Sequence, residues 1–179
     1  PFCETFFDNV KAYKGNLIGE ESKGWAIAKY LLTHEREMIS GFGAAPKKSV
    51  GQMALETIGS DATGRLANGV LRQTIAQYQL DTMVFGATMA RVGDEAKAGQ
   101  GLGAASSIFK YYGTELNKRR NELTMAVGGE LALGWDGAAY RGGTVSRDWL
   151  RSKGNSIEGG TSEVQLNIIA KRVLGLPDE

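Results

Sequence analysis

Glu35 is the residue whose position in the sequence most suggests catalysis. If the segment around it is helical, the residues three, four and seven positions away share its face, and all are apolar: Ala28, Leu31, Leu32, Met38, Ile39 and Phe42. A carboxylate on such a face loses hydration, so its pKa is expected to rise. A raised pKa suits a general base that works near neutral pH. A buried glutamate paired with an Arg or Lys of another helix explains the same pattern, and the pattern alone leaves both interpretations open.

A glycine-rich stretch from Gly154 to Glu163, GNSIEGGTSE, is the second candidate for chemistry. A turn of this kind that leads into a helix leaves backbone N–H groups free, which suits an anion or the polar edge of a ring. Glycines also let the backbone approach a ligand closely. The stretch lacks the Gly-Lys-Ser/Thr ending of a Walker A loop and the preceding strand of a Rossmann fingerprint. A plain helix cap after a loop remains the alternative.

Composition narrows the class of protein. Hydrophobic residues make up 42% of the 179 residues and charged residues 23%, which is typical of a globular domain. The net charge of +1 gives no sign of a nucleic-acid partner. The single Cys and single His argue against a disulfide, a metal site and a Cys–His nucleophile pair, and they favour a cytoplasmic location. No run approaches the roughly 18 apolar residues that a membrane span needs.

Periodicity predicts the elements that must position these residues. Residues 1–10 are rich in Phe and favour a strand. Helical periods follow in five segments, at about 25–42, 61–92, 104–127, 147–151 and 161–173, and residues 43–51 are expected to form a loop. Asp61 is a candidate N-cap, and Ser162 with Gln165 fits a capping box. The pattern predicts a mainly α protein, a bundle of antiparallel helices after a small β segment.

Two segments at opposite ends of the chain together resemble the acyl-CoA dehydrogenase family. Residues 2–10, FCETFFDNV, through residues 19–25, GEESKGW, resemble the passage from that family's middle β domain into its C-terminal domain. Residues 156–165, SIEGGTSEVQ, with 167–177 after them, resemble its C-terminal signature. The resemblance covers the whole chain. It implies that residues 1–20 are the end of the middle β domain and a linker, and that residues 21–179 form the C-terminal four-helix-bundle domain.

The family resemblance implies an activity and a cofactor. Members bind FAD, remove the α proton of an acyl-CoA thioester with a carboxylate, and pass a hydride from the β carbon to the flavin, forming a 2-enoyl-CoA. Electrons leave to an electron-transfer flavoprotein or a similar acceptor, and members form homo-oligomers or heteromeric assemblies. An acyl-CoA oxidase, a related flavin monooxygenase and a non-catalytic structural subunit are the alternatives. These residues alone are expected to be inactive, because half of the flavin and acyl-CoA site is missing from them.

The resemblance also implies site residues. Many members place the base where this chain has Gly159, but members of the isovaleryl and long-chain type place it on the first helix of the domain, before an Arg. Here that residue is Glu35, with Arg36 as a substrate-binding neighbour, and Glu158 is the alternative base.

The cofactor contacts implied by the resemblance fall into two groups: Gly159, Gly160, Thr161 and Glu163 near the flavin, and Gly128 and Gly129 near the partner subunit's adenosine. The family's Arg-x-x-Phe-Gly pattern is not visible. Residues 106–116 resemble instead a divergent bacterial branch, in which some members act on bulky or ring-bearing acyl-CoAs and some form heteromeric assemblies.

Overall fold

The computed structural model describes residues 3–41, 48–100, 103 and 105–177, and of residues 33–41 the backbone alone. Most of this chain is helical, which confirms the mainly α prediction. The α-helices are α1 (Gly24–Gly41), α2 (Val50–Ile58), α3 (Gly69–Lys97), α4 (Ala105–Gly128), α5 (Glu130–Leu133), α6 (Thr144–Lys153) and α7 (Ser162–Ile168). Short 3-10 or π turns lie at Lys14–Asn16, Ala138–Gly143, Gly154–Ser156 and Ile169–Val173.

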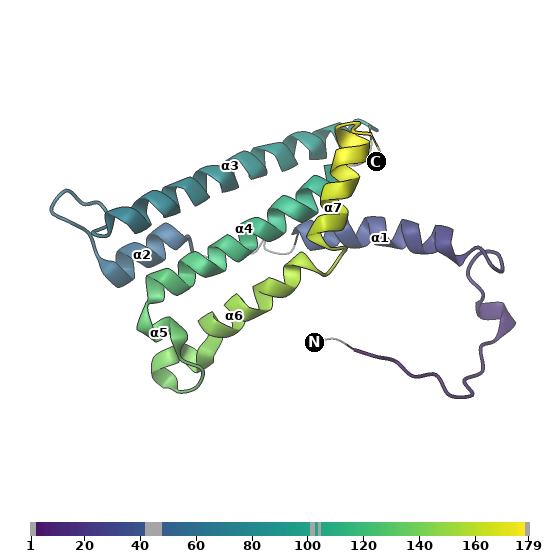
Figure 1. Ribbon diagram of the computed structural model, residues 1–179, viewed down its shortest axis with the longest axis horizontal. Coiled ribbons are helices and arrows are strands. Elements are labelled where there is room, and N and C mark those ends of the chain that lie inside the picture. The colour runs from purple at the N-terminus through teal and green to yellow at the C-terminus, as the bar shows by residue number, and fades with distance from the viewer. Residues whose placement is uncertain (1–2, 42–47, 101–102, 104, 178–179) are drawn as a thin grey trace.

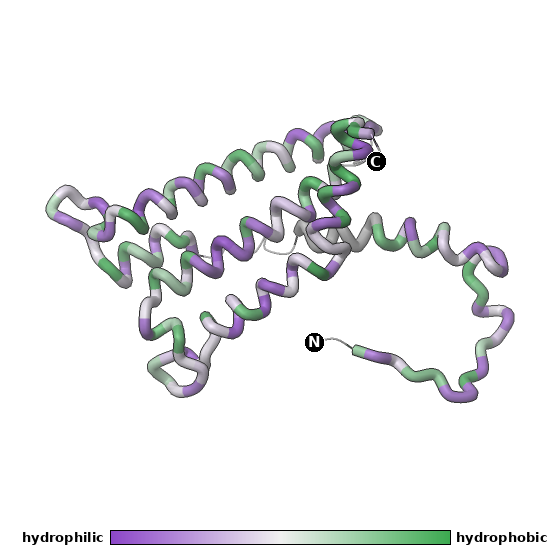
Figure 2. Tube along the Cα trace, viewed as in Figure 1, coloured by the Kyte–Doolittle hydropathy of each residue, from purple (hydrophilic) through white to green (hydrophobic). Residues whose placement is uncertain are grey.

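Helix α4 is the central element of the bundle. It contacts α1, α2, α3, α6 and α7. Helices α3 and α4 form a long antiparallel pair, with α6 along the other side of α4 and α7 crossing near the start of α4 (Figure 1). Hydrophobic and hydrophilic residues alternate along α3 and α4, as expected for helices with one face in a core (Figure 2).

The main hydrophobic core lies between α2, α3 and α4. Its buried members come from all three helices and the loop before α3: Val50, Ala54, Leu66, Ile75, Tyr78, Leu116, Leu123 and Val127. Leu116, Leu123 and Val127 follow one another at spacings of seven and four, so they line one face of α4. Phe85 of α3 meets Phe109 of α4 edge to face, with ring centroids 5.9 Å apart. These contacts pack α3 against α4.

Several predicted boundaries were wrong. The long helix begins at Gly69, where Asn68 Oδ1 accepts a hydrogen bond from Leu71 N. Asp61 does not cap it, because its carboxylate accepts from the backbone of Thr63 and closes a turn. Helix α2 was not predicted at all. The last helix is capped by the Thr161 hydroxyl, which accepts from Val164 N, so the capping box expected at Ser162 is absent.

Residues 3–10 run outside the bundle as coil. The predicted strand is not formed: between residues 3 and 41 no strand is present, and Phe6 and Phe7 are 86% and 77% exposed. A strand needs a neighbour to take up its backbone hydrogen bonds. In Figure 1 this segment loops away from the helices, and no bridge joins it to another of the described residues. The expected boundary after residue 20 stays a prediction.

Two further expectations concern absent features. Within the described ranges no helix is long and apolar enough to cross a membrane. No group of three potential metal ligands occurs in the same part of the chain.

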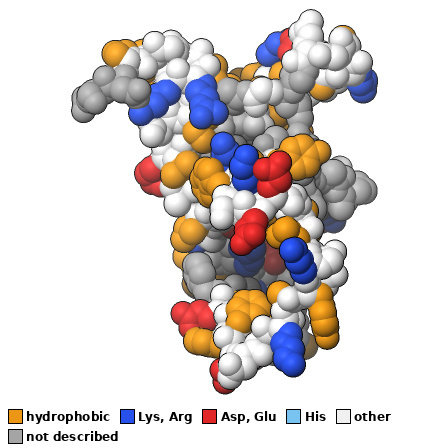
Figure 3. All heavy atoms as spheres, turned by 90° about the vertical axis from the view of Figure 1, so that its right-hand side faces the viewer, with side chains coloured by type: hydrophobic (Ala, Val, Ile, Leu, Met, Phe, Trp, Pro, Cys, Tyr) orange, Lys and Arg blue, Asp and Glu red, His pale blue; other side chains and the backbone are white. Residues whose placement is uncertain are grey.

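On the face drawn in Figure 3, basic and acidic side chains lie interspersed among hydrophobic ones.

Candidate functional site

The glycine-rich stretch forms a tight turn between α6 and α7. Gly159 and Gly160 have φ of +67° and +96°, in the region that residues with a Cβ adopt only under strain. Gln165, fully buried in α7, closes the turn because its Nε2 donates to the carbonyl of Gly159 at 3.1 Å. A Cβ on residue 160 would lie 2.5 Å from that nitrogen. The turn therefore requires glycine at position 160 for a packing reason as well as a backbone reason.

Three donors on one face of α4 attach the start of this turn to the bundle. Lys110 Nζ donates to the Asn155 carbonyl at 3.0 Å, and Asn117 Nδ2 donates to Asn155 Oδ1 at 2.7 Å. Lys118 Nζ donates to the Ser156 hydroxyl at 2.7 Å. Positions 110, 117 and 118 share a helical face because they are seven and eight residues apart. The turn is thus held by side chains of a central helix.

Lys110 is fully buried, which is rare for a lysine. Burial lowers the pKa of its ammonium group, and the negative charges of Glu158 and Glu115 oppose that shift. Its neighbours at three and four positions on α4 are all small: Ser106, Ser107, Gly113 and Thr114. This lysine among small residues is the signal that could have revealed the site from the sequence. The sequence analysis did not predict it, nor Asn117 and Lys118, and it assigned Gln165 to a capping box instead of to the turn.

Glu158 is held in an ion pair. One carboxylate oxygen accepts from Arg151 Nη2 at 2.6 Å, and the other accepts from Asn155 Nδ2. The hydrogen bond from Arg151 is the main reason that the pKa of Glu158 is lowered, and Asn155 adds to it. A general base near neutral pH needs the opposite shift. This arrangement disfavours Glu158 as the base.

Thr161 and Glu163 lie at the beginning of α7. The Thr161 hydroxyl serves as the helix cap, and Glu163 is exposed. The pKa of Glu163 is lowered, first by its own backbone N–H and then by Thr161. In the first turn of α7, Ser162 Oγ and Gln165 Oε1 are buried without a hydrogen-bond partner among the described residues. Unsatisfied buried polar atoms beside two left-handed glycines fit a ligand that offers polar groups, such as the edge of a flavin ring.

Gly128 and Gly129 lie at the other end of α4, far from this turn (Figure 1). Gly129 has φ +53° and precedes α5, and a Cβ on Gly128 would lie 2.7 Å from that of Ala132. Both glycines therefore have a local role in the reversal between α4 and α5. The structure does not bring them together with residues 158–163, and the predicted contact with a partner's cofactor stays a prediction.

Glu35 and Arg36 lie in α1, as the periodicity predicted. Helix α1 packs against α4, and the turn between α6 and α7 is attached to the same helix α4. The side chains of both residues lie outside the described part of the chain. The apolar surroundings of Glu35 and the substrate contact of Arg36 are therefore predictions still.

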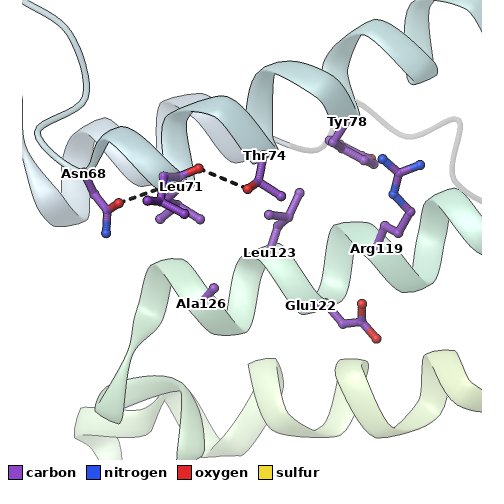
Figure 4. A pocket seen from close by; sticks show the side chains of 9 residues that line it. Asn68, Leu71, Thr74, Tyr78, Arg119, Glu122, Leu123 and Ala126 are labelled. Atoms are coloured by element: carbon purple, nitrogen blue, oxygen red, sulfur yellow. Dashed lines mark hydrogen bonds between the residues drawn. The ribbon is translucent and has the colours of Figure 1, made fainter.

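A separate groove of about 520 Å³ lies between α3 and α4 (Figure 4). Leu71 and Thr74 of α3 face Leu123 of α4 across it, and Arg119 pairs with Asp81 at 2.7 Å. Its lining is Asn68, Val70, Leu71, Thr74, Tyr78, Arg119, Glu122, Leu123 and Ala126. None of the site residues predicted from the sequence lines this groove.

Comparisons with known proteins agree with this fold. The family model described as "Acyl-CoA dehydrogenase, C-terminal domain" matches residues 22–174. Acyl-CoA dehydrogenase IpdE1 of Mycolicibacterium smegmatis is 28% identical over 99% of this chain and 43% of its own length. Acyl-CoA dehydrogenase FadE34 of Mycobacterium tuberculosis is 31% identical over 98% of this chain and 23% of its own.

A solved structure is similar as well. The ChsE4-ChsE5 complex from Mycobacterium tuberculosis matches with a TM-score of 0.63 and 25% identity, over 90% of this chain and 42% of that one. The chain thus spans less than half the length of the relatives it matches. With a family-specific match over residues 22–174 and a helical bundle shared with a solved relative, the chain belongs to the acyl-CoA dehydrogenase family, of which it carries the C-terminal domain.

Proposed function

We propose that this chain contributes the C-terminal domain of an FAD-dependent acyl-CoA dehydrogenase, which converts an acyl-CoA thioester to a 2-enoyl-CoA. The observation that carries the proposal is the turn at Gly159–Gly160, which is attached to α4 in a chain of this family. It is followed by the buried atoms Ser162 Oγ and Gln165 Oε1, which have no hydrogen-bond partner among the residues that the structure describes. When bound, FAD supplies the acceptor for the hydride. The turn and the first residues of α7, with Thr161 and Glu163, would hold the flavin's polar edge.

Glu35 is the base in this proposal. A carboxylate on the apolar face of α1 would be poorly hydrated, and a poorly hydrated carboxylate accepts a proton readily near neutral pH. Arg36 beside it would contact the substrate. Glu158 is a weaker candidate, because its ion pair with Arg151 stabilises the charged form.

A visible absorption spectrum and anaerobic titration of the complete protein that contains this domain, with a panel of acyl-CoAs, test the proposal. We expect flavin absorbance that bleaches on substrate addition. Glu35→Gln should retain the flavin and abolish bleaching, whereas the matched variant Glu158→Gln should still bleach. Normal bleaching by Glu35→Gln would overturn the assignment of the base. Steady release of hydrogen peroxide without an added acceptor would indicate an oxidase, and reduction of an electron-transfer flavoprotein would indicate a dehydrogenase.

The substrate is proposed to be a bulky or ring-bearing acyl-CoA, and the assembly to be oligomeric. Support comes from residues 106–116, which resemble the divergent bacterial branch, and from the similarity to the ChsE4-ChsE5 complex. Faster bleaching by ring-bearing than by straight-chain acyl-CoAs is the expected result. The native mass of the protein purified with its natural partners distinguishes a homo-oligomer from a heteromeric complex.

A non-catalytic subunit of the same fold is the second candidate. It is favoured by Gly159, which stands where many members place the base, and by the ion pair that occupies Glu158. A colourless protein that gains flavin absorbance only when a second subunit is added would support this alternative.

A further inference from the structure

The candidate turn rests on a buried cation. Lys110 has no exposed surface, and its Nζ donates to the backbone carbonyl of Asn155. An ammonium group in a protein interior is costly unless hydrogen bonds and opposite charges compensate for the lost water. The charges of Glu158, Glu115 and Glu163 act on it favourably, but among the described ion pairs none includes Lys110. Among the described residues, its direct compensation is therefore the carbonyl of Asn155 in the turn.

Asn155 connects this lysine to the rest of the turn. Its carbonyl accepts from Lys110, its Oδ1 accepts from Asn117, and its Nδ2 donates to the Glu158 carboxylate. Glu158 in turn binds Arg151 and precedes Gly159 directly. The chain of contacts thus leads from the interior of α4 to the residue before the two glycines. A shift of the Asn155 carbonyl would move each of these contacts.

We propose that Lys110 is a positioning residue that holds the Gly159–Gly160 turn in its binding geometry from beneath, through Asn155. The inference rests on the proposed function, in which this turn meets FAD. A buried polar contact of this kind is a poor way to gain stability, since an apolar side chain of similar size often stabilises a core as well or better. Its effect should therefore fall on the position of the turn more than on the stability of the bundle.

Lys110→Met is the main test, because methionine keeps most of the volume and removes the donor. In the full protein freed of flavin, hydrogen–deuterium exchange should rise in residues 154–161 and stay unchanged in α3. Loss of a hydrogen bond to a charged group predicts FAD binding weakened by roughly 10- to 100-fold, measured from flavin fluorescence. The urea midpoint of unfolding should stay close to that of the wild type.

Two further variants keep the test decisive. Asn117→Ala removes the second contact to Asn155 from a half-buried position, so it should give a smaller change of the same kind if Lys110→Met does not fold. Lys153→Met is the matched control. Lys153 lies two residues before Asn155, but it pairs with Glu122 and takes no part in the contacts of Asn155.

The outcomes are distinct. Unchanged exchange in residues 154–161 with unchanged FAD affinity would overturn the proposal, and so would a rise in exchange spread equally over α3 and α4 with a lower urea midpoint, which indicates a general structural role. If the wild-type protein binds no FAD, the proposed function fails, and exchange in the flavin-free protein still decides whether Lys110 positions the turn.

Discussion

Gly160→Ala perturbs the candidate site in a way that the structure makes quantitative. Residue 160 has φ +96°, and the added Cβ would lie 2.5 Å from Nε2 of Gln165. The substitution therefore has two costs. The backbone strain is about 1–3 kcal/mol. The displaced amide is fully buried, so the loss of its hydrogen bond to the Gly159 carbonyl adds about 1–3 kcal/mol.

Gly59 provides a matched control. Its φ is +87°, and no atom lies within 4 Å of the place where a Cβ would stand. Gly59→Ala therefore carries the backbone strain without the contact. We expect Gly160→Ala to lower the free energy of unfolding by about 2–6 kcal/mol, and to exceed Gly59→Ala by about 1–3 kcal/mol.

Urea unfolding of the flavin-free protein, followed by far-UV circular dichroism, measures both losses. In a Gln165→Ala background the cost of Gly160→Ala should fall to that of Gly59→Ala, because the amide that the new Cβ meets is gone. Equal losses for the two glycine variants would refute the reasoning. So would a cost of Gly160→Ala that does not depend on Gln165.

Three other predictions use the same protein. Ser49→Ala removes the capping box in which Ser49 and Gln52 cap α2, and should cost about 1 kcal/mol in urea unfolding. Leu123→Ala empties a buried position of the α3–α4 core and should cost about 2–5 kcal/mol, and a loss below 1 kcal/mol would contradict the core assignment. Arg151→Met should return the pKa of Glu158 toward its ordinary 4.5. Because the folded pKa is depressed, the ion pair stabilises the wild type above about pH 4.5 and loses its effect as pH falls through the folded pKa. Both groups are partly exposed, so the difference between the variants should be below about 1 kcal/mol at pH 7 and vanish in acid, as followed by thermal unfolding across pH.

Local pattern was sufficient for the long helices and insufficient for their ends. The apolar periods of α1 and α4 predicted those helices to within a residue or two, because a core-facing stripe must repeat with the helical period. Helix α2 was missed because it has only 9 residues and carries Gly51 inside it. Asp61 and Asn68 both suit a cap. Asn68 caps the helix, because a bridge between Ser60 and Leu66 places Asp61 in a turn ahead of it.

Some parts of the candidate site could be predicted from local sequence patterns, and others could not. The sequence predicted the turn at Gly159 and Gly160 and the helix after it. A pair of glycines just before a helix indicates a turn, and this signal is local to the sequence. The apolar stripe around the carboxylate of Glu35 was likewise predicted from the spacing of residues along one helix. Neither pattern carries information about what lies beneath the turn.

The sequence alone sufficed for the family, the mainly helical fold and the glycine turn, because each depends on residue types at short, regular separations. Only the tertiary structure revealed that Lys110 meets Asn155 across 45 positions of the chain, and that Arg151 neutralises Glu158. The physical reason is that burial and charge pairing arise between helices. A lysine in α4 and a carbonyl after α6 become neighbours only when α6 and α7 pack against α4.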